Sequence, residues 1–416
     1  MPTRFFGDKV VAATFVMAVF GWGIGFYGPP IFLYAVMQKT GWSQALCSSA
    51  VTLHFLAGTL VVVNLPRLYR LIGLPLTTVC GVITLSVGVF AWSAATQPYQ
   101  LFLAATLSGF GWVALGAAAV NAVIAPWFVS KRPGALAKAY NGASIGGVIF
   151  SSVWVYLIGS VGFANAAIGV GIVSVVVISV MCFTVFNVQP RQIGQLPDGA
   201  AGVPIEAAQA ATTPVFTLKR NRQFISLAAA MSLGLFAQIG LVSQLFLLLS
   251  RHVTEHTAGL ALGAATASAI VGRSVATRLI ARAINRRTVA CLSYGCQLAG
   301  CVSLTGLGAS PALLWLGMVL FGMGIGNATS LPPLIAQAEF PCQQVQRVVT
   351  LIVAIAQGCY AFAPMVFGGV GSVMNPGSGD WMLLAVAACT QLMAIAVLLC
   401  GGARMQRCAA GTSTRS

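Results

Sequence analysis

The sequence is poor in charged residues, and above all in acidic ones. Aspartate and glutamate number 6 among 416 residues, against 22 lysines and arginines, and charged residues together make up 7% of the chain. A soluble domain usually carries about 25% charged residues, so this composition excludes an ordinary soluble protein. The 58% share of hydrophobic residues instead predicts a polytopic membrane protein.

The few carboxylates also avoid the middle of every long apolar segment. They are Asp8, Asp198, Glu206, Glu255, Glu339 and Asp380. The segments therefore hold no carboxylate pair, and they show no His/Glu metal motif and no nucleophile placed beside a base. We expect a protein that is not an enzyme and that has neither a metal site nor a cofactor. We do not expect nucleic acid as a partner either. The net charge of +16 comes from basic residues that fall in short clusters between apolar runs, as in membrane proteins.

Paired cysteines around exposed loops are also missing. Most of the 11 cysteines lie inside apolar runs, where cysteine behaves as a small buried hydrophobic residue, so we predict no disulfide. The first apolar run, residues 10–37, is too long for the apolar core of a cleavable signal peptide.

What the sequence does have is a series of twelve apolar segments with short polar breaks. Each is long enough to cross about 30 Å of hydrocarbon. Backbone groups in lipid must be hydrogen-bonded within the chain, so we predict an all-α membrane protein of twelve transmembrane helices. The segments are residues 10–37, 44–65, 74–96, 100–126, 135–159, 164–186, 223–249, 258–280, 288–308, 312–336, 347–372 and 381–402.

Basic residues alternate between the loops. They cluster in residues 67–70, 131–138 and 278–287, whereas the intervening loops carry only Lys39 and Arg251. Positive charge accumulates on the cytoplasmic side of membrane proteins, so both termini are expected there. We therefore expect an integral protein of the plasma membrane, which is the inner membrane in a bacterium.

One long polar stretch divides the chain. Residues 187–222 contain four prolines, and this composition indicates a cytoplasmic linker. They separate an N-terminal six-helix bundle (residues 1–186) from a C-terminal one (residues 223–402), which a cytoplasmic tail follows (residues 403–416).

The two bundles show faint internal repetition. Asn121 stands five residues before a proline, as Asn327 does in the second half, and Asn141-Gly matches Gln357-Gly. Such duplication predicts two pseudo-symmetric bundles with a substrate site between them at mid-membrane.

Arg273 is the most informative single residue. It lies in the stretch 258–287, which no proline interrupts, so that a helix can run through it. The arginine is about 22 Å from the start of this helix, beyond the middle of the bilayer but short of the basic cluster. A cation there costs about 2.5–3.5 kcal/mol if it faces lipid. We expect Arg273 to face a central cavity and bind an anion, the alternative being an arginine that snorkels to the headgroups.

The twelve segments, the central linker and the basic loops resemble the major facilitator superfamily. Within it, the chain is similar to the monocarboxylate porter and oxalate/formate antiporter branch. Three stretches carry this narrower likeness: residues 41–44 (Gly-Trp-Ser-Gln), residues 127–135 with 141–147, and the pair Gly272-Arg273.

The resemblance implies that Arg273 binds the substrate carboxylate. It also implies that Tyr27 and Tyr34, seven residues apart on one helix face, line the anion cavity. The alternative is an interfacial belt of tyrosines, which Tyr34, near the periplasmic end of its segment, would fit almost equally well. Oxalate-type members have a lysine where this chain has Gln357, and one positive charge suits one carboxylate better than two. Proton-coupled members have an aspartate where this chain has Ala269, which argues against proton coupling through a buried carboxylate. Exchange against a counter-anion, uniport, and proton transfer through another group stay open.

Amides inside the apolar segments must be paired or face water. Asn141 and Gln357 rank first as cavity-shaping residues because they occupy matching places in the two halves, and Asn121 and Asn327 follow. Contacts between helices would explain these amides equally well. His54, the histidine within a segment, either titrates during transport or is a packed, hydrogen-bonded residue.

Two further features bear on gating. Lys131 and Arg132, in a predicted cytoplasmic loop, either latch one conformation or only set the topology. The pairs Pro29-Pro30 and Pro332-Pro333 should kink or break the first and tenth helices.

We predict a secondary active transporter of small organic anions, with monocarboxylates favoured. It would work by alternating access, as a monomer in the lipid bilayer. The alternatives are an exporter of hydrophobic or amphipathic compounds with a structural Arg273, and a membrane sensor that does not transport.

Overall fold

The computed structural model describes residues 5–129, 131–197, 221–306, 310–373 and 378–401. The N-terminal half begins with the two pieces of the first predicted helix and continues to residue 186. Its elements are α1 (Gly7–Gly25), α2 (Gly28–Thr40), α3 (Gln44–Ile72), α4 (Leu74–Ala94), α5 (Pro98–Val113), α6 (Ala117–Ile124), α7 (Arg132–Val161), α8 (Phe163–Met181) and the π-helical turn η1 (Cys182–Phe186).

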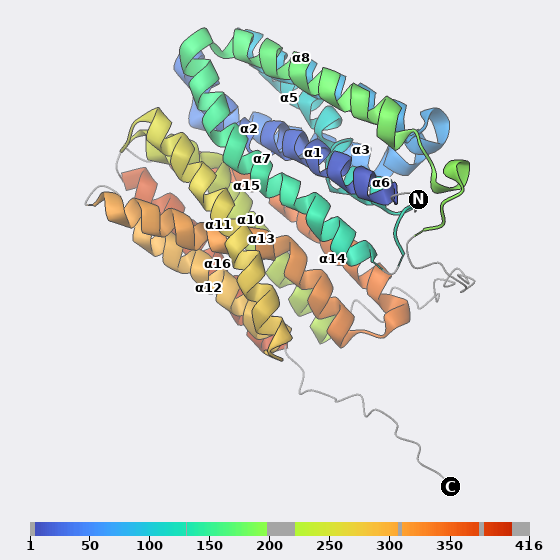
Figure 1. The fold of residues 1–416 in the computed structure, drawn as a ribbon. Helices are drawn as coiled ribbons and strands as arrows, with labels where there is room; N and C mark the ends of the chain where they lie inside the picture. The colour runs from blue at the N-terminus through green and yellow to red at the C-terminus, as the bar shows by residue number, and fades with distance from the viewer. Residues whose placement is uncertain (1–4, 130, 198–220, 307–309, 374–377, 402–416) are drawn as a thin grey trace.

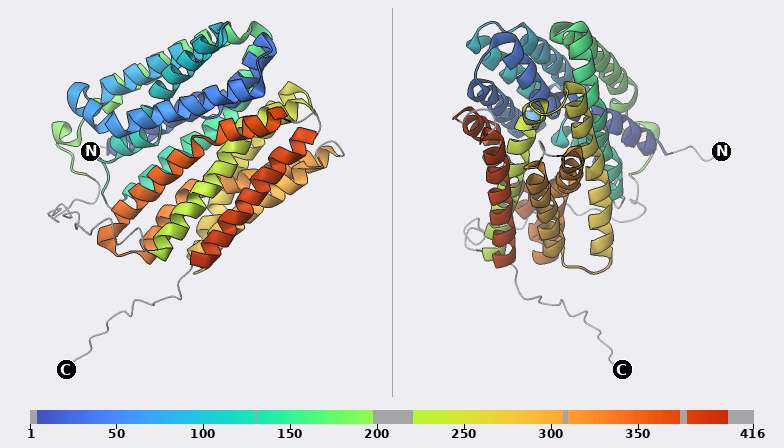
Figure 2. Two further views of the ribbon diagram at one scale, coloured as in Figure 1. Left: turned by 180° about the vertical axis from the view of Figure 1, so that it is seen from behind. Right: turned by 90° about the vertical axis from the view of Figure 1, so that its left-hand side faces the viewer.

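The C-terminal half follows from residue 222. Its helices are α10 (Arg222–Ser250), α11 (Glu255–Ala281), α12 (Arg286–Leu304), α13 (Pro311–Glu339), α14 (Cys342–Tyr360), α15 (Ala363–Val373) and α16 (Ser378–Gly401). Figures 1 and 2 show the two halves side by side, the first in blue to green and the second in yellow to red. Of the predicted linker, residues 187–197 are described and include a short 3-10 turn (Pro190–Ile193); residues 198–220 and the predicted tail lie outside the described residues.

The predicted all-α fold with twelve helices is confirmed. Within the described ranges, 11 helical segments are long and apolar enough to span a membrane. The twelfth, α12, is more polar because it begins with Arg286 and Arg287 and carries the buried Gln297. It packs between α13 and α16, so Arg287 and Gln297 are covered by protein.

Three predicted helices are each divided into two pieces. The first is interrupted at Phe26 and Tyr27, the fourth after Val113 and the eleventh at Ala361 and Phe362. The first break is explained by Pro29 and Pro30, which lack an N–H and so fit only the first turn of α2. The break predicted at Pro332 and Pro333 does not occur, and α13 runs through both prolines as one helix.

The stretch 258–287 is divided between two helices, whose bounds are close to the predicted segments 258–280 and 288–308. Helix α11 ends at Ala281, and Ala283 adopts a left-handed conformation with φ of 62°. The side chain of Asn285 then accepts a hydrogen bond from the backbone of Arg287 and begins α12. The basic cluster is therefore divided between two helices.

The halves meet mainly through three pairs of helices, namely α7 with α11, α3 with α15 and α2 with α10, and α3 also contacts α14. Small residues allow the closest approach, as is usual for helices in membranes. A Cβ atom on Gly147 of α7 would lie 2.6 Å from the Thr266 side chain of α11, and one on Gly259 would lie 3.0 Å from the Ser151 carbonyl oxygen. Larger residues at these positions would push α7 and α11 apart.

The two ends of the bundle differ. We call the end with residues 131–132 and 278–287 the basic end, and the end with residues 40–44 and 250–255 the far end. At the far end, Gln44 donates to Gln244 over 2.8 Å, and Arg251 donates to Gln44 over 3.3 Å. These bonds join the two halves, so the far end is closed.

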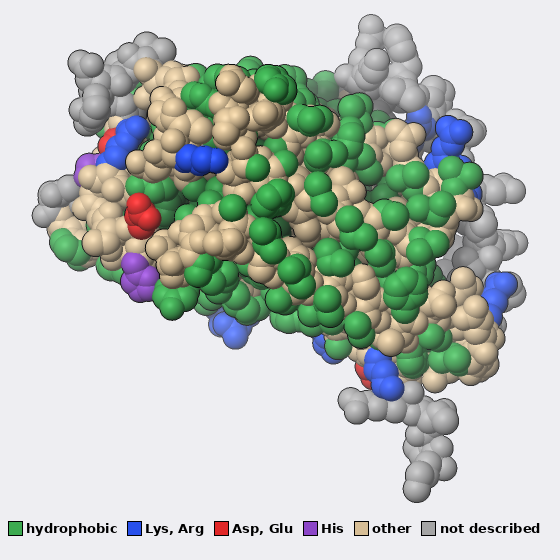
Figure 3. Space-filling model, turned by 90° about the horizontal axis from the view of Figure 1, so that it is seen from above, with side chains coloured by type: hydrophobic (Ala, Val, Ile, Leu, Met, Phe, Trp, Pro, Cys, Tyr) green, Lys and Arg blue, Asp and Glu red, His purple; other side chains and the backbone are tan. Residues whose placement is uncertain are grey.

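Charge at the far end is concentrated around one carboxylate. Asp380 accepts from Arg251 at 2.5 Å and contacts the His252 ring at 3.0 Å. On the face drawn in Figure 3, hydrophobic side chains cover the middle, the histidines lie at one end, and lysines and arginines lie at both ends. Among the described residues, no group of three histidine, cysteine or acidic side chains could hold a metal ion.

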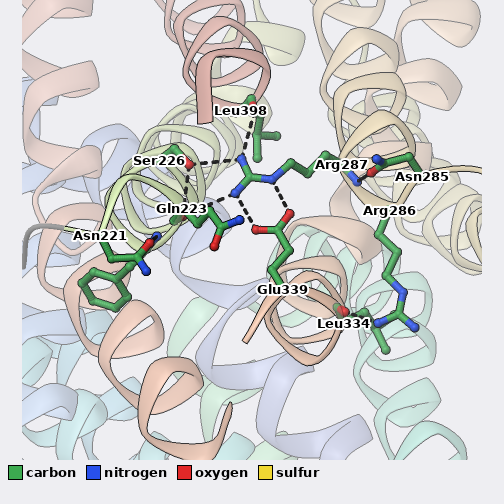
Figure 4. Close-up of polar contacts among 10 residues, drawn as sticks. Asn221, Gln223, Ser226, Asn285, Arg286, Arg287, Leu334, Glu339 and Leu398 are labelled. Atoms are coloured by element: carbon green, nitrogen blue, oxygen red, sulfur yellow. Dashed lines mark hydrogen bonds and ion pairs between the residues drawn. The ribbon is translucent and has the colours of Figure 1, made fainter. Parts of the chain in front are cut away.

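A buried arginine ties the C-terminal half together at the basic end (Figure 4). Arg287 is 5% exposed and holds Glu339 by two hydrogen bonds, of 2.5 and 2.8 Å. It also donates to the Ser226 hydroxyl and the Leu398 carbonyl oxygen at 3.1 and 2.9 Å. This arginine therefore links α10, α12, α13 and α16.

Candidate functional site

Arg273 lies at the contact between the two halves. It extends from α11 toward α7, where Nη2 donates to Ser144 Oγ at 2.7 Å and Nη1 donates to Asn141 Oδ1 at 3.3 Å. Asn141 and Ser144 are three residues apart on α7 and thus on one helix face. The structure brings Arg273 together with one predicted residue, Asn141, and one that the sequence analysis did not select.

The guanidinium has no acidic partner in the part of the chain that the structure describes. The ion pairs found there involve Arg251, His252 and Arg287. Within the same residues, the Nε of Arg273 is buried and makes no hydrogen bond. Arginine carries five N–H donors, and neutral oxygens at Nη1 and Nη2 use only some of them. This arrangement suits a guanidinium that binds an anion.

Helix α13 also packs beside Arg273, in addition to α7. A Cβ atom added to Gly326 would lie 2.6 Å from Arg273 Nε and 2.9 Å from the Ala269 carbonyl oxygen. A residue larger than glycine would therefore displace the guanidinium or separate α11 from α13.

Tyr27 lies beside this site. Its side chain is 7% exposed and lies close to Arg273. It also packs against Gly147 and lies next to Thr266, so it stands where α7 and α11 approach each other. Tyr27 is the residue before α2, at the break after α1.

The side chain of Tyr34 does not lie near Arg273. Its hydroxyl donates to Glu255 Oε1 at 2.9 Å, at the start of α11. Glu255 precedes Arg273 by 18 residues, which is about 27 Å along a helix. Because the helix is broken at Phe26 and Tyr27, the seven-residue spacing does not place the tyrosines on one continuous face. Tyr34 belongs to the closed far end.

The other predicted amides make separate contacts. Gln357 of α14 donates to Thr59 of α3 at 3.3 Å, which is a further bond between the two halves. Asn121 donates to the Tyr140 hydroxyl at 2.7 Å, inside the N-terminal half. Gln357 thus lies between the halves, whereas Asn121 links α6 to α7.

Asn327 is buried inside the C-terminal half. It donates to Ser293 at 2.7 Å and to the carbonyl oxygen of Gly272, the residue before Arg273, at 3.3 Å. It therefore acts as a contact between helices that steadies the segment carrying Arg273.

The remaining candidates lie away from Arg273. Lys131 and Arg132 stand at the start of α7, at the basic end, and their role as a latch stays a prediction. His54 is 1% exposed; its Nε2–H donates to the Gly25 carbonyl oxygen at 2.9 Å, and its Nδ1 lies 2.8 Å from Ser108 Oγ. His54 is thus a packed residue of α3 that lies against the end of α1.

Comparison with known proteins agrees with this architecture. The sequence model of the Major Facilitator Superfamily matches residues 11–364. No curated protein matched the sequence. The fold is similar to that of a D-xylose–proton symporter, with a TM-score of 0.74 and 12% identity, covering 95% of this chain and 97% of the other.

Two other solved structures have the same fold. A nucleoside transporter, NupG, gives a TM-score of 0.70 at 12% identity and covers 95% of this chain and 98% of its own. A bacterial homologue of the human lysosomal transporter Spinster, inward-facing and unoccupied, gives 0.66 at 15% identity and covers 96% and 95%. At these identities the likeness concerns the fold alone.

Proposed function

Because the chain belongs to the Major Facilitator Superfamily and is thus a membrane transporter, we propose that it carries small organic anions, in particular monocarboxylates. The observation that carries this proposal is Arg273, a partly buried cation between the halves without an acidic partner among the described residues. A carboxylate would form a charge-assisted bond with this guanidinium, and such bonds are about twice as strong as neutral ones.

The balance of charge favours one carboxylate on the substrate. Gln357, where oxalate-type relatives carry a lysine, is neutral and is bonded to Thr59. A dicarboxylate bound at Arg273 would therefore hold its second charge without a cationic partner, which is costly away from water.

Binding would also change the contact between the halves. Ser144 and Asn141 occupy two donors of Arg273 from the opposite half, and a carboxylate would compete for these donors. In our proposal the substrate enters from the basic end, because hydrogen bonds close the far end, and it loosens α7 from α11 as it binds. Rocking of the two halves around this site would then complete alternating access.

The loop charges support the proposed orientation, in which the basic end and both termini face the cytoplasm. We further propose that the protein works as a monomer in the inner membrane of a bacterium. Exchange against a counter-anion and uniport are compatible with the site, whereas coupling to a proton would need a group other than a carboxylate at position 269, which is alanine.

The test is uptake of labelled monocarboxylates and dicarboxylates into proteoliposomes, with and without an internal anion and with and without a pH gradient. We expect uptake of monocarboxylates that is lost in Arg273→Ala and retained in Arg278→Ala, which changes an exposed arginine of the same helix. Uptake stimulated by internal carboxylate would indicate exchange, and uptake that follows the pH gradient would indicate proton coupling. Full transport by Arg273→Ala would refute the assignment of Arg273, and uptake of no carboxylate by folded protein would favour the exporter.

A further inference from the structure

Helix α15 begins inside a membrane-spanning segment, where the eleventh helix is divided at Ala361 and Phe362. The N–H groups in the first turn of a helix have no partner within the helix itself. Pro364 has no N–H, and the first bond of this helix runs from the N–H of Val366 to the Phe362 carbonyl oxygen at 3.2 Å. The N–H of Met365 therefore needs an acceptor from elsewhere.

This acceptor comes from the other half of the protein. The Met365 N–H donates to the hydroxyl oxygen of Thr52 on α3 at 2.9 Å, and Thr52 is 4% exposed. Such an acceptor normally belongs to the residue just before the helix, as the side chain of a serine, threonine, asparagine or aspartate. Here that residue is Phe362, whose hydrocarbon side chain cannot accept a hydrogen bond. The cap of α15 is thus supplied across the contact between the halves.

The same face of α3 continues to contact α15 toward the far end. A Cβ atom on Gly368 would lie 2.1 Å from Ser48 Oγ, and one on Gly371 would lie 2.4 Å from Gln44 Nε2. Ser48 and Gln44 precede Thr52 by about one and two helical turns, so successive turns of α3 lie against α15. A movement that opens the far end separates this row and takes the acceptor away from α15.

Gln244 of α10 binds to both of these helices. Its amide donates to the Ser48 hydroxyl at 3.0 Å and to the Pro364 carbonyl oxygen at 3.4 Å, and its side chain is completely buried. Buried polar groups lose such partners at a high cost unless water replaces them. Opening of the far end therefore has to bring water to the start of α15.

We propose that Thr52 caps α15 only while the far end is closed, and that this cap between the halves is a latch that favours the closed far end. When the far end opens, the Met365 N–H exchanges the Thr52 hydroxyl for water. Loss of a typical N-terminal cap changes an equilibrium about fivefold, so the latch biases the alternation of the halves without preventing it. The proposal uses only the relative movement of the halves and does not depend on which substrate is carried.

The experiment is hydrogen exchange of the purified full-length protein in nanodiscs without substrate, followed by mass spectrometry. Exchange through opening scales with the population of the open state. Peptides from residues 40–48 and 244–252 report on the far end, and peptides from residues 361–367 report on the start of α15. We expect Thr52→Val, which keeps the shape of the side chain but loses the acceptor, to raise exchange about fivefold in all three regions.

Two matched variants separate the hydroxyl from other effects of substitution. Thr52→Ser keeps the hydroxyl and should exchange like wild type. Thr84→Ala removes a threonine hydroxyl that donates within its own helix, to the Cys80 carbonyl oxygen at 2.7 Å, and should also exchange like wild type.

A further variant supplies the cap from within the C-terminal half. Phe362 is 45% exposed, and Phe362→Ser places a hydroxyl at the residue where caps usually stand. Helix α15 then no longer needs Thr52. We expect Phe362→Ser alone to raise exchange at the far end but not in residues 361–367, and Thr52→Val to add nothing in this background. Phe362→Ser decides the matter if Thr52→Val does not fold.

Three results would overturn the latch. Faster exchange confined to residues 361–367 in Thr52→Val would mean that the cap steadies α15 only locally. Equal exchange in Thr52→Ser and Thr52→Val would mean that the hydroxyl has no role. A full effect of Thr52→Val in the Phe362→Ser background would mean that the hydroxyl acts on another group. The proposed function stands or falls separately, in the uptake experiment.

Discussion

Arg273 on α11 donates a hydrogen bond to Ser144 on α7, with 2.7 Å between Nη2 and Oγ. The two residues belong to different halves of the transporter. A transporter of this family moves its halves against each other, so a bond between them at mid-membrane must be broken and re-formed during transport. Arg273, which we propose binds the substrate, therefore also holds the two halves together when no substrate is bound.

Removal of the hydroxyl of Ser144 should strengthen carboxylate binding. In Ser144→Ala the guanidinium loses a neutral partner that competes with the substrate. Hydrogen bonds to charged groups contribute about 1.5–3 kcal/mol, so we expect the half-inhibitory concentration of monocarboxylates to fall about tenfold. Ser160→Ala, at the exposed end of the same helix, should have no effect. Weaker binding in Ser144→Ala would mean that the hydroxyl contacts the substrate.

The glycine opposite the guanidinium should be essential. Gly326→Ala adds a Cβ atom 2.6 Å from Arg273 Nε, and overpacking of this kind costs about 1–3 kcal/mol. We expect loss of most monocarboxylate uptake with protein that is still inserted, as judged by size-exclusion chromatography. Gly358→Ala is the matched control, since nothing lies within 4 Å of the added atom. Equal uptake by the two variants would contradict the geometry described for α13.

The two tyrosines should differ in their effect. Tyr27→Ala should raise the half-inhibitory concentration of monocarboxylates, because Tyr27 adjoins Arg273. Tyr34→Phe should leave it within about twofold, since this change loses only an outlying bond to Glu255, and exposed bonds of this kind contribute about 1 kcal/mol or less. A larger effect of Tyr34→Phe than of Tyr27→Ala on the half-inhibitory concentration would mean that Tyr34 belongs to the binding site.

The buried ion pair of the C-terminal half should matter for stability rather than for recognition. Arg287→Ala leaves Glu339 without its partner, and the loss of one member of a buried pair costs about 3–5 kcal/mol. We expect a clear drop in the melting temperature of the purified protein. Arg282→Ala, which changes an exposed neighbour, should melt like wild type. Equal melting of the two variants would show that the pair is not stabilising.

Much of the fold could be predicted from the sequence, because apolar segments of membrane length have few alternatives to helices. The break after α1 was foreseen from Pro29 and Pro30. The continuity of α13 through Pro332 was not, because neighbouring helices can satisfy the backbone groups that proline frees.

The site could be predicted only in part. Arg273 stood out because a cation is rare in an apolar helix. Its partner Ser144 did not, since the choice among polar residues of α7 depends on how that helix is rotated against α11. Likewise, Arg287 and Glu339 are 52 residues apart, and nothing in the sequence pairs them.

The central claim is that Arg273 binds a carboxylate, and equilibrium binding tests it most directly because it does not depend on translocation. We would measure the affinity of purified protein in nanodiscs for phenylacetate and for phenylacetamide, in wild type and in Arg273→Gln. The account predicts binding of the acid alone, and loss of that binding in the variant. Equal affinity for acid and amide, or unchanged binding of the acid in Arg273→Gln, would contradict it.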